Sequence, residues 1–388
     1  MTVAENNVSG AVREGVVPAS SRAERFASYD VEAFEVPGGR EENWRFTPMK
    51  RLHKLHEGPD ATGEVTVDAD PAPEVTVETV ARGDKRLGEA GKPSDRIAAQ
   101  AFSTFVSATV VTVPKETKAS KPSVIRITGP GEGKLAYGHV QVRAEAFAEA
   151  AIVLDHVGSG TYADNVEFVI GDSARLTVVS VQDWADDAVH VSEQHLRLGR
   201  DASLRHIVVT LGGDVVRVSP TATFAGPGGD VEMLGLYFAD AGQHQEHRLF
   251  VDHAEPNCKS NVMYKGALQG EGAHGVWIGD VLIRAAAEGT ETYEVNRNLV
   301  LTSGARADSV PNLEIETGEI TGAGHASATG RFDDEQLFYL QSRGIDEQQA
   351  RQLVVRGFFH EILAKIDIPE VRERLQAAIE AELEAVNA

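Results

Sequence analysis

The fold is decided by a stretch that occurs twice, first as Phe168-Val169-Ile170-Gly171-Asp172-Ser173-Ala174-Arg175-Leu176 and again as Leu196-Arg197-Leu198-Gly199-Arg200-Asp201-Ala202-Ser203-Leu204. The copies align glycine with glycine, alanine with alanine and leucine with leucine, and Gly199 follows Gly171 by 28 residues (199 − 171). Each copy runs into a valine-rich segment, so the unit is a strand, a glycine turn, a second strand and a second turn. A fixed period of this kind indicates stacked units that cannot bury an apolar face alone.

The same character extends from about Ser123 to Ile320, where short β-branched runs are separated by Gly, Asp and Asn turns and helical periodicity is almost absent. This region lacks the closely spaced Asn-Gly and Asp-Gly turns that connect hairpins, which favours a parallel β-helix over a sandwich. We therefore predict a mainly β protein with a β-helix core over residues 123–325.

Two flanking regions have a different character. Residues 1–20 are expected to be disordered, and residues 21–122 to form an N-terminal helical region, with one helix from Ser21 and an acidic linker over residues 57–74. Later in this region a helix near Ile97 to Phe105 and a strand at Thr109 to Val113 are predicted.

Residues 326–388 are predicted to form a C-terminal helical domain. Arg343-Gly344 ends its first helix, Asp346 caps the second and Pro369 opens the third. Two adjacent phenylalanines, Phe358 and Phe359, are unsuited to facing one core together, so one of them is expected to be available to a partner. Packing of these helices against the β core is the competing interpretation.

Length and charge limit the class of protein. The 388 residues suffice for two or three structural units, and 37 basic against 59 acidic residues give a formal net charge of −22. That balance disfavours nucleic acid or an anionic membrane as the main partner. The start of the chain has no signal-like apolar run, and no window approaches a membrane span, so a cytoplasmic protein is expected. The single cysteine, Cys258, cannot by itself supply the usual four thiolates of an iron–sulfur cluster.

The most distinctive single residue is His325. It is surrounded by small residues in the stretch Gly324-His325-Ala326-Ser327-Ala328-Thr329-Gly330, which we interpret as a loop directly before a helix. An imidazole with so little bulk around it is free to meet a metal, a proton or a partner chain. A hydrogen bond within a turn is the structural alternative.

Several segments carry a resemblance to a known family. They are Asn257-Cys258-Lys259-Ser260, Tyr264-Lys265-Gly266, Leu299 to Ser303, Pro311-Asn312-Leu313-Glu314-Ile315 and the His325 to Ile345 stretch. In motif order these resemble the SufB/SufD family of iron–sulfur cluster assembly proteins, and Glu42-Asn43-Trp44-Arg45-Phe46-Thr47 resembles the N-terminal motif of SufD members. The resemblance implies a central right-handed β-helix flanked by helical domains, a SufB paralogue as partner and the SufC ATPase as a second partner.

Single positions favour the SufD branch. SufB-type members carry a cysteine at the position that corresponds to Asn296, and many relatives have one at the position of Ala323, whereas His325 matches the histidine of SufD members. The resemblance therefore implies that His325 is a metal ligand candidate at a partner interface, shared with a thiolate of SufB during transient cluster assembly. It also places the ATPase contact in the C-terminal helices, for which Arg343, Phe358 and Phe359 are our candidates.

Other candidate chemistry is weaker. His244, His247, His253 and Cys258 are residue types of a zinc site, but on a strand 244 and 247 face opposite sides, so a surface or turn role is preferred. Cys258 is interpreted as a small buried hydrophobe. The run from Gly129 to Leu135 has one residue too few between its glycines for a P-loop and is interpreted as a turn, so no nucleotide site is expected in this chain.

Two function classes follow. The first is a non-catalytic scaffold subunit that pairs with SufB, or with itself in the absence of SufB, and docks the ATPase. The second is a stand-alone β-helix carbohydrate-active enzyme, for which the chain shows neither a signal peptide nor a basic groove. A zinc-dependent binding protein that uses the His244 group is a third option.

Overall fold

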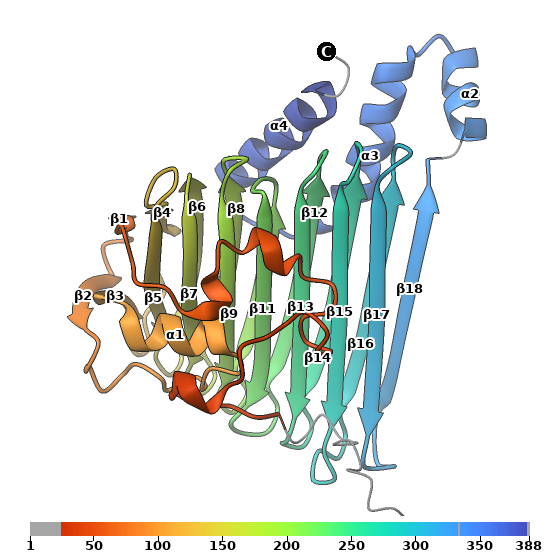
Figure 1. The fold of residues 1–388 in the computed structure, drawn as a ribbon. Coiled ribbons are helices and arrows are strands. Elements are labelled where there is room, and N and C mark those ends of the chain that lie inside the picture. Colours follow the sequence, from red (N-terminus) through yellow and green to blue (C-terminus); the bar gives the residue numbers. More distant parts are fainter. Residues whose placement is uncertain (1–24, 333, 386–388) are drawn as a thin grey trace, which may run out of the picture.

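The core of the protein is a β-solenoid of about eight turns in the computed structural model, which describes residues 25–332 and 334–385 (Figure 1). The chain alternates between two facing nine-stranded sheets, and from β3 and β4 onward each strand runs parallel to the strand two positions later. The predicted mainly β class with a parallel β-helix core is confirmed.

The strands of sheet A are β1 (Thr66–Asp70), β4 (Ser123–Thr128), β6 (Glu149–Gly158), β8 (Arg175–Trp184), β10 (Ser203–Thr210), β12 (Asp230–Ala239), β14 (Lys259–Leu268), β16 (Glu291–Val300) and β18 (Gly322–Arg331). Those of sheet B are β2 (Thr76–Ala81), β3 (Ser107–Val113), β5 (Leu135–Ala144), β7 (Thr161–Ile170), β9 (Val189–Leu198), β11 (Val215–Phe224), β13 (His244–His253), β15 (His274–Ile283) and β17 (Arg306–Ile315). The α-helices are α1 (Arg96–Thr104), α2 (Asp334–Ser342), α3 (Glu347–Leu363) and α4 (Pro369–Ala385).

The repeat that decided the fold sets the register of neighbouring coils. Phe168 pairs with Leu196 in sheet B, and Leu176 pairs with Leu204 in sheet A, which preserves the 28-residue spacing (196 − 168 and 204 − 176). Elsewhere the spacing varies, from 26 residues between Ile152 and Val178 to 32 between Ser260 and Thr292. Turns of unequal length therefore hide most of the repeats from inspection of the sequence.

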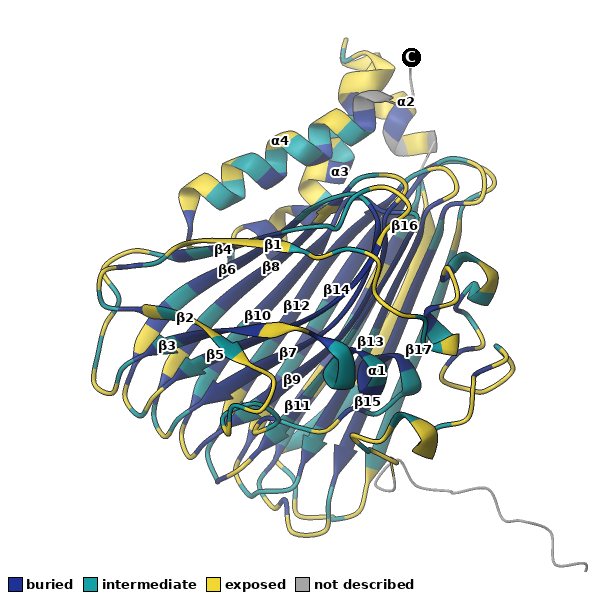
Figure 2. Cartoon of the chain, turned by 60° about the vertical axis from the view of Figure 1, so that its left-hand side comes forward, coloured by how far each residue is buried: buried dark blue, intermediate teal, exposed yellow. Residues whose placement is uncertain are grey.

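Each sheet has an inner face in the solenoid and an outer face covered by other parts of the chain. The inner faces share one large apolar cluster, which includes Ile152, Phe168 and Leu204. Helices α3 and α4 cover the outer face of sheet A, and α1 with the segment around Trp44 covers the outer face of sheet B. Because both faces are covered, most residues of the strands from β5 to β15 are buried (Figure 2).

The C-terminal helices begin and end where their sequences predict. Gly344 has a φ of 85° after α2, and its N–H donates to the carbonyl of Gln341, as in a glycine helix stop. The Asp346 carboxylate accepts from the N–H of Gln349 at the start of α3, and Pro369 is the first residue of α4. Among the described residues, no helix is long and apolar enough to cross a membrane.

The N-terminal region differs from the expectation. Residues 25–30 are not helical, and within the described residues 25–122 the helices other than α1 are short 3₁₀ turns at Val31–Ala33, Met49–Arg51 and Leu55–Glu57. The segment expected to be an acidic linker contains β1, whereas α1 and β3 confirm the later helix and strand. The apolar side chains of this region pack one by one against sheet B, and this packing can form without a regular helix. The disorder expected for residues 1–20 lies outside the described residues.

Candidate functional site

His325 lies in the middle of β18, the last strand of sheet A, and not in a loop. The loop prediction was wrong because pairing with β16 imposes an extended backbone on small residues that have little strand preference of their own. The strand also extends six residues beyond the predicted end of the core, from 325 to 331. The helix after it begins at Asp334, within the acidic run Asp333-Asp334-Glu335 where the sequence predicts a helix start.

The side chain of His325 faces the inner side of the sheet, at the mouth of the solenoid. His325 pairs with Glu294 on β16, and the Oε2 atom of Glu294 reaches to 2.3 Å from where a Cβ on Gly279, in the opposite sheet, would stand. The imidazole Nδ1 of His325 is 3.7 Å from Glu294 Oε1. The histidine side chain is 42% exposed, whereas the carboxylate is buried. A buried acceptor thus stands beside an accessible imidazole and can orient it.

The inner face of the last coil is polar. Thr292, Glu294, Asn296 and Asn298 alternate along β16, and all four are buried. The Asn298 amide donates to Asn296 Oδ1 at 2.8 Å and lies 3.4 Å from the hydroxyl of Thr329 on β18. Glu294 is a residue that the sequence analysis missed, although the period of two in polar residues through a buried strand would have revealed it.

The two positions to which the family resemblance assigns thiols in relatives share this face. Ala323 precedes His325 by two residues and pairs with Thr292, while Asn296 pairs with Ser327. The strand alternation puts 323, 325 and 327 on one side of β18. The structure therefore brings together the three positions that the sequence singled out, with one imidazole, one amide and no thiol among them.

This mouth is bordered by the free edges of two long strands. β17 and β18 end their sheets, and no described segment pairs with their outer edges (Figure 1). Every residue of β18 is partly or fully exposed, in contrast to β7, which is buried throughout. Ile315 at the end of β17 is 44% exposed, so some apolar surface of the solenoid interior is also accessible to solvent here. An unpaired strand of ten residues is a template for another chain.

The three candidate docking residues of the C-terminal helices differ in their exposure. Phe359 is fully buried in the cluster between α3 and sheet A, so it is not available to a partner. Phe358 is half-buried beneath the ammonium of Lys265, which lies 5.3 Å from its ring centroid. Arg343 is exposed, with its guanidinium over the ring of Tyr339 at 5.1 Å.

Helix α2 exposes aromatic residues that the sequence analysis did not select. Phe338 is 72% exposed and Tyr339 57% exposed, next to Arg343. Their exposure depends on which side of α2 faces the rest of the chain, and a helix of nine residues with weak amphipathic character does not reveal that. The apolar faces of α3 and α4 instead pack against the β core, as the competing interpretation held.

The histidines of the proposed zinc group do not converge. His244 lies on the outer face of sheet B against His274, with 3.1 Å between their Nδ1 atoms, while His247 lies on the inner face against Thr210. The preferred surface or turn role was nevertheless wrong, because His244, His247 and His253 are all buried in β13. Cys258 is buried in the inner core, where burial raises the pKa of its thiol, as expected for a small hydrophobe.

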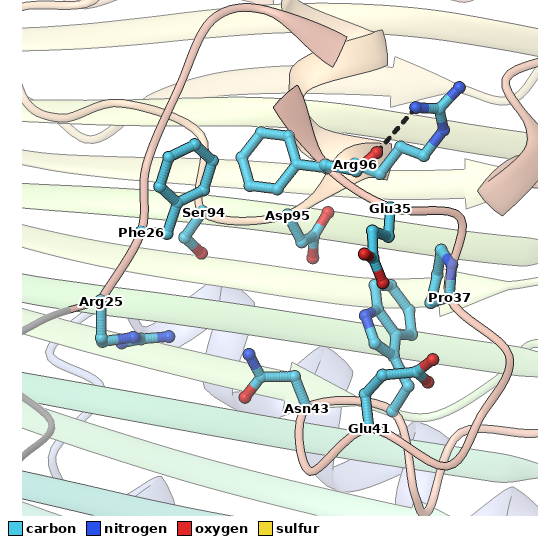
Figure 3. Close-up of a pocket in the computed structure, with 11 residues that line it drawn as sticks. Arg25, Phe26, Glu35, Pro37, Glu41, Asn43, Ser94, Asp95 and Arg96 are labelled. Atoms are coloured by element: carbon cyan, nitrogen blue, oxygen red, sulfur yellow. Dashed lines mark hydrogen bonds between the residues drawn. The ribbon is translucent and has the colours of Figure 1, made fainter. Parts of the chain in front are cut away.

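A cavity of about 250 Å³ lies between the N-terminal segment and the residues before α1 (Figure 3). Its polar groups are already engaged within the chain. The Arg96 guanidinium donates to the carbonyls of Val31 and Phe34, and the Glu41 carboxylate accepts from the N–H groups of Gly38 and Gly39. We therefore assign this cavity to the packing of the segment on sheet B.

The fold and the mouth together define a class of protein, a β-solenoid with a polar open end and a free strand edge. Comparison with known families identifies the particular one. Residues 125–358 match the SufBD core domain of the SUF system for Fe-S cluster assembly, so the chain belongs to this family.

Relatives support the same assignment. The chain is 67% identical over 378 residues to iron–sulfur cluster assembly SufBD family proteins of Mycobacterium bovis and Mycobacterium tuberculosis, covering 96% of this chain and 95% of theirs. A SufBD family protein of Mycobacterium leprae is 63% identical over 380 residues, or 96% of this chain and 97% of its own. A second M. tuberculosis member is 28% identical over 219 residues, which are 56% of this chain and 26% of that protein. The family assignment favours cluster assembly over a carbohydrate-active enzyme.

Proposed function

We propose that this protein is a SufD-type, non-catalytic scaffold subunit that assembles with a SufB paralogue and the SufC ATPase to build iron–sulfur clusters in the cytoplasm. The observation that carries the proposal is the position of His325 at an open solenoid mouth, beside a free strand edge. Family membership supplies the link to cluster assembly, and the second SufBD protein in M. tuberculosis is an example of a paralogue that can occur in the same organism.

Pairing with the paralogue takes place at β17 and β18. β18 is ten residues long, and its outward side chains are Gly, Ala, Ala and Gly at positions 324, 326, 328 and 330. Small side chains let another backbone approach closely, and the free edge can extend its ladder into the partner. A second solenoid at this end would also cover the partly exposed inner residues of the last coil.

His325 then faces the partner chain. Its imidazole can ligate iron or move a proton, and the buried carboxylate of Glu294 at 3.7 Å holds it in position. Because Asn296 and Ala323 offer no thiolate, the sulfur ligands of a nascent cluster come from the partner or from delivered sulfide. The cluster is cargo here, and a ligand set divided between two chains releases it when the chains separate.

The ATPase docks on the C-terminal helices. We assign the contact to α2, where Phe338, Tyr339 and Arg343 are exposed together, with Phe358 at its margin. An aromatic pair beside an arginine has the composition of an interaction hot spot. The ATPase partner binds and hydrolyses the nucleotide. Its movement is passed through the scaffold and opens the interface between the scaffold and the paralogue.

The proposal as a whole is tested by co-expression with the paralogue and the ATPase. We expect one stable complex on gel filtration. In that complex His325→Ala should leave assembly and ATPase activity intact but lower cluster formation at least about 10-fold, because it removes the imidazole that faces the partner chain. Thr329→Ala, on the same face of β18, is the matched control and should retain cluster formation.

Two results would contradict this proposal. A chain that stays monomeric and binds neither the paralogue nor the ATPase would exclude the scaffold role. If the chain alone also forms no dimer, pairing with itself is excluded as well. Normal maturation of iron–sulfur enzymes with His325→Ala would remove the histidine from the mechanism.

The docking surface has its own test. Phe338→Ala with Tyr339→Ala should weaken ATPase binding by about 100-fold, because loss of exposed aromatic anchors typically costs about 2 kcal/mol or more. Arg343→Ala should weaken it less, and Leu353→Ala, an exposed residue of α3, serves as control. Binding measured by surface plasmon resonance that is equal for all these variants would place the contact elsewhere.

A further inference from the structure

Far from the mouth, the interior of the solenoid contains a second group of ligand-type side chains. His156 on β6, Asp164 on β7 and His190 on β9 project inward from the two facing sheets, and all three are buried. One nitrogen of each imidazole and one carboxylate oxygen lie within 4.8 Å of one another. Neither cluster assembly nor partner binding, as proposed above, uses these residues.

Hydrogen bonds determine the state of His190. The indole N–H of Trp184 can only donate, and it donates to Gln182 Oε1 at 2.8 Å, which fixes the orientation of that amide. Gln182 Oε1 also lies 2.7 Å from His190 Nδ1, so Nδ1 carries a proton and donates it. The other ring nitrogen, Nε2, is thereby directed at Asp164 Oδ1, 3.2 Å away. A carbonyl that holds Nδ1 in this way is the usual outer partner of a metal-bound histidine.

His156 contributes a second nitrogen with no partner. Its Nδ1 lies 3.1 Å from the carbonyl of Val181 and 3.2 Å from the amide nitrogen of Gln182, whereas Nε2 makes no hydrogen bond among the described residues. Asp164 Oδ2, 4.0 Å from Nε2, is equally without a hydrogen-bond partner there. Leaving buried polar atoms without partners destabilises the folded state, and a cation between them would remove that cost.

The charges suit a cation as well. Burial lowers the pKa of His156 to about 4, so its imidazole is neutral near pH 7 and has a lone pair to offer. Burial alone would raise the pKa of Asp164, but the charge of His190 and its hydrogen bond outweigh that and keep the carboxyl ionised. Two imidazoles and one carboxylate are a common ligand set for Zn²⁺ and Fe²⁺.

We propose that His156, Asp164 and His190 bind one divalent first-row transition-metal ion inside the solenoid. With metal–ligand bonds of about 2.0–2.2 Å, the ligand atoms must draw together by about 1 Å, chiefly on the His156 side. The site is separate from the mouth at β18 and does not rest on the proposed function. It joins sheet A to sheet B, so the bound ion stabilises the N-terminal half of the solenoid.

An approach for the ion exists on one side. A cavity of about 230 Å³ is bordered by Gly63, Val65, Gly138 and Tyr162. The Tyr162 ring stacks on His190, with 5.2 Å between ring centroids and 12° between planes. Gly138 is required beside it, because a Cβ there would stand 2.0 Å from the tyrosine hydroxyl. Tyr162 thus lies between the cavity and a ligand, and its movement would admit an ion.

The experiment measures metal content of the full-length chain. Co²⁺ or Zn²⁺ is supplied both during expression and to the purified, chelator-treated protein, and bound metal is counted after gel filtration. We expect about one ion per chain, visible d–d absorption for Co²⁺, and an X-ray absorption spectrum of the Zn²⁺ form with two imidazoles and no sulfur.

Variants test the assignment of the ligands. Asp164→Asn keeps the side-chain volume, and His156→Gln removes an imidazole; each should weaken binding at least about 100-fold. His206→Gln changes an equally buried inner histidine on β10 and should bind as the wild type does. If either ligand variant fails to fold, the absorption spectrum of the wild-type protein still decides.

Three outcomes would overturn the proposal. The first is no bound ion under either mode of supply, which would leave a buried Asp164–His190 ion pair. The second is equal binding by Asp164→Asn and the wild-type chain. The third is a spectrum without two imidazoles.

Discussion

The two ends of the solenoid are built differently. At the N-terminal end β1 and β2 are five and six residues long, pair antiparallel with their neighbours, and carry Asp68, Asp70 and Glu78. At the C-terminal end β17 and β18 are ten residues each and continue the parallel ladder, and β18 contains no Asp, Glu or Lys and no Arg before its last residue, Arg331. Short, acidic, reversed edges discourage pairing, whereas a long edge of small residues permits it. The difference supports the proposal that another chain pairs at the C-terminal end.

The interior changes along the same direction. On β4 the inward residues are Ile125 and Ile127, members of the apolar core. On β16 the four buried inward residues, Thr292, Glu294, Asn296 and Asn298, are polar. Stacking of identical backbone units leaves the side chains free to differ, so the same architecture serves as core at one end and as site at the other.

The largest effect is expected from core truncation. Phe168→Ala, in a fully buried part of β7, should lower the free energy of unfolding by about 3–5 kcal/mol through lost burial and a residual cavity. Leu313→Ala, on the half-buried inner face of β17, should cost only about 1 kcal/mol. Urea unfolding followed by circular dichroism measures both. Equal losses of unfolding free energy in the two variants would mean that the C-terminal end of the solenoid is as well packed as its interior.

The next largest effect is expected from Glu246, a residue of sheet B that contacts the N-terminal segment. Glu246 is fully buried and accepts a hydrogen bond from the Thr47 hydroxyl at 2.8 Å. Burial alone would raise its pKa, but Arg217, His244 and Arg248 together lower the pKa to about 2. Glu246→Gln should therefore reduce stability at pH 7 by about 3 kcal/mol.

The sign of the pH dependence follows from that lowered pKa. The folded-state pKa lies below the unfolded value of about 4.3, so the stabilisation is complete above that pH and is lost as the pH falls towards 2. The gap between wild type and variant, measured by urea unfolding, should narrow from pH 7 to pH 3. Glu64→Gln, at an exposed carboxylate, is the control and should change little. A gap that is constant with pH would show that the ionised form of Glu246 is not what matters.

The smallest effect on the fold, and the most direct test of the two edges, comes from added charge. Ala326→Lys with Ala328→Lys places two cations on the outward side of β18 and should weaken binding to the paralogue at least about 100-fold, or about 2.7 kcal/mol. Stability should change by less than about 0.5 kcal/mol, because both positions are exposed. Ala69→Lys on β1 is the matched control at the other end. Paralogue binding is measured by sedimentation velocity. If Ala69→Lys weakens it as much as the β18 double variant does, the proposed difference between the two ends is wrong.

Part of the fold and of the site is predictable from the sequence. The repeat around Gly171 and Gly199 predicts the solenoid, Asp346 and Pro369 mark helix ends, and Cys258 is buried as expected, because each depends on local geometry or on burial of one side chain. His325 could be selected as a residue but not placed in a strand, since pairing with β16 overrides the weak preferences of Gly, Ala and Ser. The choice between Phe358 and Phe359 was open for a similar reason, as it depends on how α3 rests on sheet A.

The sequence by itself determined that this chain stacks β units, carries three helices after the β core and has no cysteine beside His325, because periodicity, capping and residue identity are local properties. Only the tertiary structure decided that Glu294 stands behind His325, that α2 and not α3 presents the exposed aromatics, and that His156, Asp164 and His190 meet across the solenoid. These juxtapositions depend on the register between coils, which is set by turns of unequal length that no single-residue pattern encodes.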